Sequence, residues 1–181
     1  MNILPARLHG ALIIEPRVSG DKRGFFLESY SRPLLREHGI DTEFIQDNHS
    51  RSEATGVLRG LHFQLPPMTQ AKLVRVTQGS VMDVIVDLRK GSPTFGQWES
   101  FELSATNFRI LFVPAGFAHG FCTTRPQTEV QYKVDAPYSP RHEAAIAWND
   151  PDLAIPWPIQ DPQLSDKDRT APPFAGFLSP F

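Results

Sequence analysis

The sequence lacks several features that identify common classes of protein. It contains a single cysteine, Cys122, so no disulfide can form within the chain, which favours a reducing compartment. No apolar run approaches the roughly 18 residues of a membrane-spanning helix, and no segment has the pattern of a secretory signal. The net charge of −2 leaves no broad basic surface for nucleic acid. We therefore expect a cytoplasmic protein that binds neither a membrane nor nucleic acid.

The motifs of several enzyme classes are also missing. There is no G-x-x-x-x-G-K-[ST] loop and no G-x-G-x-x-G fingerprint, which argues against NTPases and Rossmann-type dehydrogenases. The zinc-protease pattern H-E-x-x-H, the C-x-x-C pair and the G-x-S-x-G elbow are absent as well. Any chemistry must therefore come from a less common set of side chains.

Proline, by contrast, is abundant, with 17 residues of 181. Because proline breaks helix interiors, a bundle of long helices is excluded. Short alternating or β-branched stretches separated by turns predict an all-β sandwich or barrel with one short helix at 31–39. The predicted strands cover 8–15, 25–30, 72–78, 81–88, 98–103, 109–113 and 128–134. Seven prolines lie in the last 31 residues, so we expect a single domain, 1–181, in which 150–181 form a proline-rich wrapping tail.

Three side chains in this pattern suit acid–base chemistry. Lys72 shares a strand face with Val74, Tyr132 shares one with Val130, and His62 lies between apolar neighbours, so all three are expected to face inward. A base, a cation and a weak acid suit proton abstraction next to a carbonyl group. Each residue also has a simpler interpretation, as a satisfied core histidine, a lysine that reaches the barrel rim, and a packed tyrosine.

The segment PAGFAHGF around His119 resembles the second motif of cupins, which are small jelly-roll barrels that often bind a metal. The first cupin motif needs two histidines and a glutamate around His62, and this chain has no glutamate there. Two imidazoles fall short of the usual ligand set. We therefore predict no metal and no cofactor, with a metal-dependent cupin oxygenase kept as an alternative.

Long segments of the chain resemble the dTDP-4-dehydrorhamnose 3,5-epimerase family of the rhamnose pathway. The segments are GDKRGFFLESY (20–30), FIQDNHS (44–50), VLRGLHFQ (57–64), KLVRVTQGSVMDVIVDLRKGSPTFGQW (72–98), PAGFAHGF (114–121), YSP (138–140), WND (148–150) and LSDKD (164–168). The resemblance implies a cupin-like jelly roll with short helices, assembled as a homodimer. It also implies an isomerase that converts dTDP-4-dehydro-6-deoxy-D-glucose to dTDP-4-dehydro-L-rhamnose by inverting carbons 3 and 5.

The resemblance further implies a role for each matching residue. His62 would be the base, Asp168 would orient it, Tyr132 would be the acid on the opposite face of the sugar, and Lys72 would stabilise the enolate. Tyr138 would stack on thymine. The other substrate contacts, some of them across the dimer interface, would come from Arg23, Glu28, Gln46, Asp47, Asn48, Arg59, His119, Glu143 and Lys167.

Some alternatives stay open. Related enzymes of antibiotic-sugar pathways invert carbon 3 only, and a cupin that binds sugar nucleotides without catalysis is a third possibility. Ser165 to Asp168 also matches a helix-capping pattern, which gives Asp168 a structural alternative. Asp83 is either a satisfied polar group in a buried strand or a support for the site.

Overall fold

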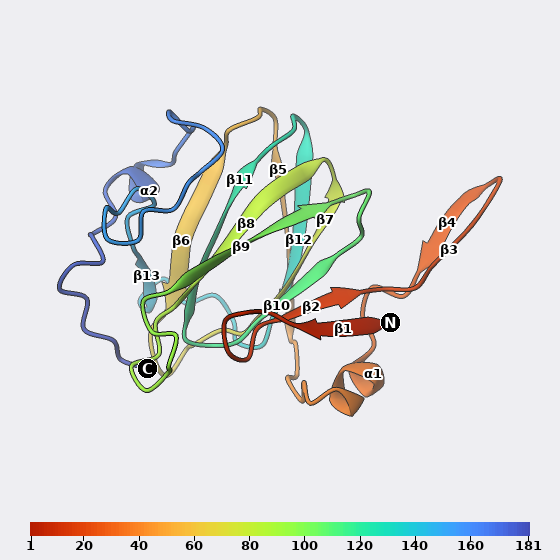
Figure 1. Ribbon diagram of the computed structural model, residues 1–181, viewed down its shortest axis with the longest axis horizontal. Helices are drawn as coiled ribbons and strands as arrows, with labels where there is room; N and C mark the ends of the chain where they lie inside the picture. Colours follow the sequence, from red (N-terminus) through yellow and green to blue (C-terminus); the bar gives the residue numbers. More distant parts are fainter.

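The computed structural model describes residues 1–181 and consists mainly of two antiparallel sheets (Figure 1). In order, the six-stranded sheet contains β1 (Asn2–Pro5), β2 (Leu12–Glu15), β10 (Ile110–Val113), β7 (Lys72–Gln78), β12 (Thr128–Val134) and β5 (Gln46–Ser52). The five-stranded sheet contains β13 (Glu143–Ala145), β6 (Leu58–Gln64), β11 (Phe117–Thr123), β8 (Ser80–Asp87) and β9 (Trp98–Ser104). The predicted cupin-like jelly roll is confirmed.

The main core lies between the two sheets. Inward-facing residues such as Val74 and Val130 of the six-stranded sheet pack with Ile85 of β8 and Phe121 of β11. Alternation along β7 and β12 explains this, because every second residue of a strand faces the core. The predicted bounds of both strands are correct, and Lys72 is buried on the same side as Val74.

Two further clusters cover the outer faces of the sheets. Outside the six-stranded sheet, Leu35 of helix α1 (Arg32–Glu37) packs with Leu73 and Ile110. The helix begins after Ser31 with proline in its first turn, as the sequence predicts. The second helix, α2 (Asp166–Arg169), has four residues, and neither helix has the length and apolar character needed to cross a membrane.

Two predicted strands need correction. The predicted strand 25–30 is extended only as far as Leu27, in β4 (Gly24–Leu27). The stretch 8–15 was expected to be a single strand, but only Leu12–Glu15 is extended as β2. Gly10 adopts a positive φ of 91°, and the amide of Ala11 donates to the carbonyl of Leu8 at 3.1 Å, so residues 8–11 form a turn. The apolar residues Leu8 and Ala11 are nevertheless completely buried, which explains why their sequence resembles a strand.

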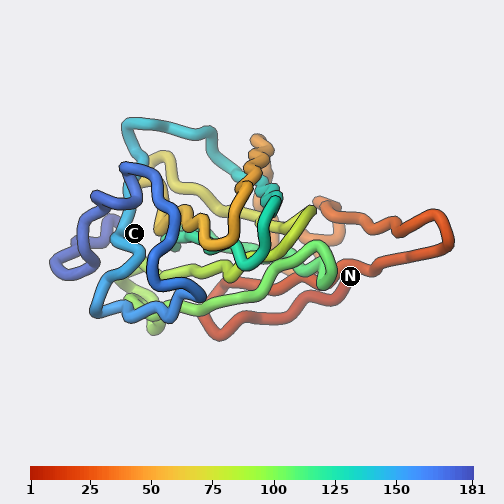
Figure 2. Tube along the Cα trace, turned by 90° about the horizontal axis from the view of Figure 1, so that it is seen from above, coloured from red at the N-terminus to blue at the C-terminus, as the bar shows by residue number.

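A two-stranded hairpin of β3 (Val18–Asp21) and β4 (Gly24–Leu27) projects from one end of the molecule, opposite the C-terminal segment (Figures 1 and 2). Phe25 and Phe26 on this hairpin are 63% and 75% exposed. Phe25 contacts Phe108, with ring centroids 4.8 Å apart. These two phenylalanines are therefore among the most exposed large apolar residues of the chain.

The C-terminal segment lies over the outer face of the five-stranded sheet. Phe177 and Phe181 pack edge-on against Phe63 of β6, and the hydroxyl of Ser179 donates to the carbonyl of Leu88. The amide of Phe174 donates to the buried carboxylate of Asp150 at 2.7 Å. These contacts bury apolar surface outside the barrel, so the strand that carries His62 is packed on both sides.

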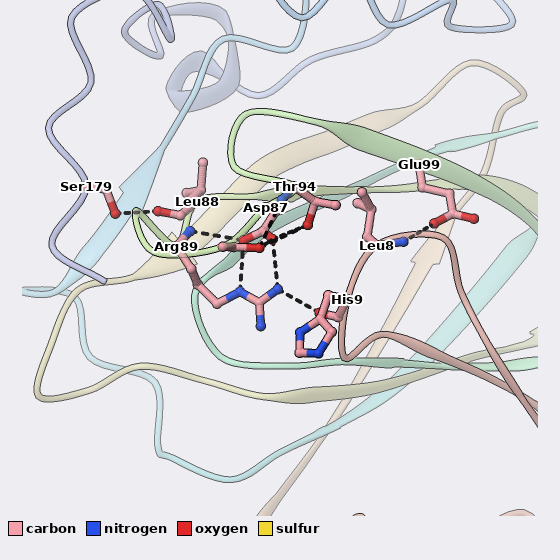
Figure 3. A network of polar contacts seen from close by, with 9 residues as sticks. Leu8, His9, Asp87, Leu88, Arg89, Thr94, Glu99 and Ser179 are labelled. Atoms are coloured by element: carbon pink, nitrogen blue, oxygen red, sulfur yellow. Dashed lines mark hydrogen bonds and ion pairs between the residues drawn. The ribbon is translucent and has the colours of Figure 1, made fainter.

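A polar network surrounds the carboxylate of Asp87, the last residue of β8 (Figure 3). Its carboxylate is completely buried and accepts hydrogen bonds from the Arg89 guanidinium at 2.8 Å, from Ser92 at 2.5 Å and from Thr94 at 2.7 Å. Burial raises the pKa of Asp87, but these hydrogen bonds outweigh it and lower the pKa to about 2. Arg89 also donates to the carbonyl of His9 at 2.7 Å, which ties the N-terminal turn to β8.

We expect Asp87→Ala to lower the free energy of unfolding by about 3 to 5 kcal/mol, because it leaves the Arg89 charge without its buried partner. Glu53→Ala is the matched control. Glu53 pairs with Arg51 on the exposed surface, and the two residues are separated by the same two positions as Asp87 and Arg89. Its cost should be below about 1 kcal/mol. Because the folded pKa of Asp87 is about 2, its stabilisation should be complete above about pH 4 and decline as the pH falls towards 2. Equal costs for the two variants in denaturant titrations would contradict this.

Candidate active site

A cavity of about 280 Å³ opens at one end of the barrel, between the two sheets. It receives His62 from β6 of the five-stranded sheet and Lys72 and Tyr132 from β7 and β12 of the six-stranded sheet. The imidazole and the phenol therefore belong to opposite walls. The complete lining is Gln46, Asn48, His62, Phe63, Gln64, Gln70, Lys72, Tyr132, Tyr138 and Glu143.

Two glycines let β6 and β11 approach closely beside this cavity. A Cβ atom on Gly60 would lie 2.5 Å from the Cα of Gly120, and one on Gly120 would lie 2.8 Å from the carbonyl oxygen of Arg59. Gly60 also has a φ of 136°, which side-chain-bearing residues rarely adopt. The pairing puts His119 directly opposite His62, with an irregularity in register just beyond it. Larger residues at the two glycine positions would separate the strands that carry these imidazoles.

His62 is hydrogen-bonded through Nε2 to Oδ1 of Asp168, at the buried end of α2. Burial raises the pKa of Asp168, but hydrogen bonds from His62, Ser165 and the Gly60 amide outweigh it, and the net pKa is lowered. An ionised carboxylate only accepts hydrogen bonds, so the proton of the neutral imidazole is on Nε2 and Nδ1 is free to accept one. The pair therefore fixes the tautomer in which Nδ1 of the neutral imidazole is the proton acceptor.

The helix-capping interpretation of Asp168 also holds. Ser165 is the N-terminal cap of α2, and its hydroxyl oxygen accepts a hydrogen bond from the amide of Asp168 at 3.2 Å. The same hydroxyl donates to Oδ2 of Asp168 at 2.8 Å. The cap thus fixes the carboxylate that contacts His62, and the two roles support each other.

Lys72, Asp83 and His119 form a buried charged cluster next to the cavity. Nε2 of His119 lies 3.0 Å from both carboxylate oxygens of Asp83. Burial lowers the pKa of Lys72 to about 8, although the charge of Asp83 opposes this. Burial also lowers the pKa of His119, again against the effect of Asp83. The structure contains no group of three or more His, Cys, Asp or Glu side chains that could hold a metal ion.

Tyr132 faces the cavity from β12, on the same side of the strand as Val130. Burial raises the pKa of its phenol, and the positive charge of Arg59 partly opposes the increase. The phenol therefore keeps its proton at neutral pH. The Arg59 guanidinium is held at 3.4 Å by Ser52 and by the carbonyl of Arg51.

The outer rim of the cavity carries polar side chains that are hydrogen-bonded to one another. The hydroxyl of Tyr138 donates to Glu143 at 3.0 Å, and Lys167 donates to the same carboxylate oxygen at 2.7 Å. The hydrogen bond from Lys167 is the main reason that the pKa of Glu143 is lowered. Gln46 and Asn48 of β5 are bonded to each other at 2.8 Å and complete this rim.

Three of the predicted substrate-binding residues lie outside the cavity. Arg23 is in the projecting hairpin, paired with Asp21 at 2.6 Å, and Glu28 follows that hairpin with an exposed side chain. Asp47 points to the outer side of β5, where it contacts Lys133 at 2.7 Å. Alternation along β5 accounts for this, because Gln46 and Asn48 face the cavity and the residue between them must face outward.

Four residues at the site, Phe63, Gln64, Gln70 and Asp83, were not assigned from the sequence, although alternation along a strand could have placed two of them. Asp83 was left open, although it shares the parity of Val81 and Ile85, whose side chains enter the core. Gln64 was missed, although it lies two residues after His62 on the same face of β6. The alternation of a strand was sufficient to orient both.

The jelly roll thus holds a histidine bonded to a carboxylate, a buried lysine, and a tyrosine on the opposite wall of one cavity. This combination is typical of a cupin-like enzyme that transfers protons. Comparison with known proteins agrees with this class. Residues 5–176 match the family model described as dTDP-4-dehydrorhamnose 3,5-epimerase. The chain belongs to the dTDP-4-dehydrorhamnose 3,5-epimerase family of isomerases.

Individual relatives cover nearly the whole chain. The dTDP-4-dehydrorhamnose 3,5-epimerase of Pseudomonas aeruginosa is 55% identical over 166 residues, which is 91% of each chain. The crystal structure of the Bacillus anthracis enzyme, with TDP and PPi bound, has a TM-score of 0.93 and 53% identity and covers 95% of this chain and 98% of its own. The Legionella pneumophila enzyme in complex with dTDP-4-keto-L-rhamnose has a TM-score of 0.91 and 48% identity, covering 95% and 92%.

We expect Asp83→Asn to lower the pKa of Lys72 below its value of about 8, because the charge of Asp83 raises this pKa against the effect of burial. NMR titration of labelled lysine side chains, with Lys72→Met used to assign the signal, measures the change. An unchanged or higher pKa in the variant would show that Asp83 does not control the charge of Lys72.

Proposed function

We propose that this chain epimerises dTDP-4-dehydro-6-deoxy-D-glucose at carbons 3 and 5 to give dTDP-4-dehydro-L-rhamnose. The observation that carries the proposal is the placement of the His62–Asp168 pair and Tyr132 on opposite walls of one cavity. Inversion of a carbon next to a ketone needs proton removal on one face and proton return on the other. Membership of the family supports this substrate.

The base in this reaction is His62. Nδ1 takes the proton from the carbon next to the 4-keto group, and the electron pair moves into the carbonyl to give an enolate. Asp168 stabilises the imidazolium that forms, because its carboxylate stays ionised. The burial of the carboxylate makes this interaction stronger than it would be in water.

Lys72 stabilises the enolate oxygen with its positive charge, an effect that is large in a cavity with little water. Its pKa of about 8 keeps most of the ammonium charged at neutral pH and makes it sensitive to mildly basic pH. Tyr132 then gives its phenolic proton to the opposite face of the carbon. The imidazolium of His62 releases its proton to solvent and the tyrosinate regains one, so the cycle closes and consumes no oxidant, reductant or co-reactant.

The volume of the cavity indicates which part of the substrate it holds. At about 280 Å³ it is at the lower end of ligand-site volumes, so it suits the sugar while the nucleotide lies along the rim. Tyr138 is half-exposed and stacks on thymine, with Gln46 and Asn48 beside it. Arg59 and Lys167 supply positive charge for the diphosphate, and Glu143 holds Lys167 and Tyr138 in place. His119 lies behind the cavity wall, where it contacts Asp83.

We expect solvent deuterium to enter the substrate at both carbon 3 and carbon 5, observed by NMR in heavy water. His62→Ala should reduce exchange at both positions by at least about 10²-fold, because no base remains. Exchange at carbon 3 alone would instead identify a monofunctional 3-epimerase. Binding of dTDP without any exchange would identify a non-catalytic binding protein.

Tyr132→Phe should separate the two halves of the reaction. Because the base is intact, we expect this variant to lose epimer formation by about 10²-fold while it retains more of the proton exchange. The product is followed by NMR alongside the exchange. An equal loss of both activities would contradict the assignment of Tyr132 as the acid.

We also propose that residues 1–181 act as one unit and assemble as a homodimer. Residues 150–181 form its wrapping tail and supply Asp168 to the base on β6. The dimer is supported by the exposed Phe25 and Phe26 of the projecting hairpin. In this arrangement the hairpin of one chain brings Arg23 and Glu28 to the other chain's nucleotide. Asp47, which faces outward beside the half-buried Arg75, lies on the surface between the two chains.

A mixing experiment tests whether the hairpin acts on the partner's site. His62→Ala and Arg23→Glu should each be nearly inactive alone. Dissociated and reassociated in equal amounts, they form mixed dimers in which one site has both wild-type residues, so about one quarter of wild-type activity should return. No recovery, with mixed dimers verified by mass spectrometry, would mean that Arg23 acts within its own chain or not at all.

A further inference from the structure

Gln64 is a buried polar residue at the end of β6, where its side chain is only 4% exposed. It lies two residues after His62 on the same face of the strand, so it lines the cavity beside the base. A buried amide is costly unless its hydrogen-bonding groups are satisfied. The partners of Gln64 therefore indicate its role.

All of these partners belong to the backbone of two loops. Nε2 donates to the carbonyl of Met68 at 2.6 Å and to the carbonyl of Pro137 at 3.2 Å. Oε1 accepts from the amide of Ser139 at 2.7 Å. Both N–H groups of the amide are thus used within the protein, which leaves none to donate to a substrate.

The two bonds to Pro137 and Ser139 flank Tyr138. The tyrosine itself is 51% exposed, and its remaining polar contacts are to Glu143 and Gln46 on the rim. Its position therefore depends on the backbone that Gln64 holds. Gln70 makes one further bond to the same loop, from Nε2 to the carbonyl of Ala136 at 2.7 Å.

We propose that Gln64 is a positioning residue that joins the strand of the base to the loop of Tyr138, and so sets the distance between the two ends of the site. The proposal rests on the proposed function, in which His62 acts on the sugar and Tyr138 stacks on the nucleoside. Gln64 fixes the loop before the nucleotide arrives, which spares binding the cost of ordering it. Its effect is on nucleotide affinity and leaves proton transfer unchanged.

Gln64→Met tests this, because methionine has a similar length and cannot make these hydrogen bonds. We expect the Kd for dTDP and the KM for the keto sugar nucleotide to rise together by about tenfold. The kcat and its pH profile should stay within about twofold of wild type. Gln78→Met, at the exposed end of β7, is the control and should change none of these values.

A fall in kcat with an unchanged Kd for dTDP would overturn the proposal, because Gln64 would then act on the reacting sugar. An unchanged kcat together with an unchanged Kd for dTDP would also overturn the proposal. Circular dichroism shows whether Gln64→Met folds. If it does not, Gln70→Met is used instead, because Gln70 holds the same loop through Ala136. This variant must then raise the Kd for dTDP, and an unchanged Kd overturns the proposal. If the wild-type protein shows no deuterium exchange, the proposed function itself fails. If the wild type is active and Gln64→Met has an unchanged Kd for dTDP, only the role of Gln64 fails.

Discussion

The contact between His62 and Asp168 joins residues that are 106 positions apart, and much of the structure serves to maintain it. The carboxylate determines which nitrogen of the neutral imidazole carries the proton, and therefore which nitrogen can accept one. For Asp168 to reach the barrel, the chain after β13 must fold back over the five-stranded sheet. The aromatic residues of the tail anchor this path on Phe63, directly next to His62. The capping serine then sets the orientation of the carboxylate.

A second constraint is the balance of charge inside the barrel. The apolar core occupies one part of the space between the sheets, and Lys72, Asp83 and His119 occupy the part next to the cavity. An isolated ammonium ion there would be very costly, and the nearby carboxylate of Asp83 reduces this cost without removing it. The result is a lysine whose pKa is lowered to about 8. The same carboxylate holds His119, so one buried acid organises two groups.

The sequence predicted strands from alternating residues or from continuous apolar stretches, and it missed strands that have neither pattern. Strands β7 and β12 were bounded correctly because apolar and polar residues alternate along them. Strand β5 was not recognised, because the residues it turns inward, such as Gln46, Asn48 and Ser50, are polar. The turn at Gly10 was missed for the opposite reason, since Leu8 and Ala11 are buried without being extended. Burial and strand periodicity coincide only when the barrel interior is apolar.

The sequence alone determined the all-β architecture and the inward direction of Lys72 and Tyr132, because both follow from local alternation along single strands. Resemblance to the family added the identities of the other site residues without their geometry. Only the tertiary structure decided that Arg23 lies in a projecting hairpin, outside the cavity lining, and that Gln64 is hydrogen-bonded to two loops. These features depend on how distant segments meet, and a periodic pattern within one strand carries no information about its partners.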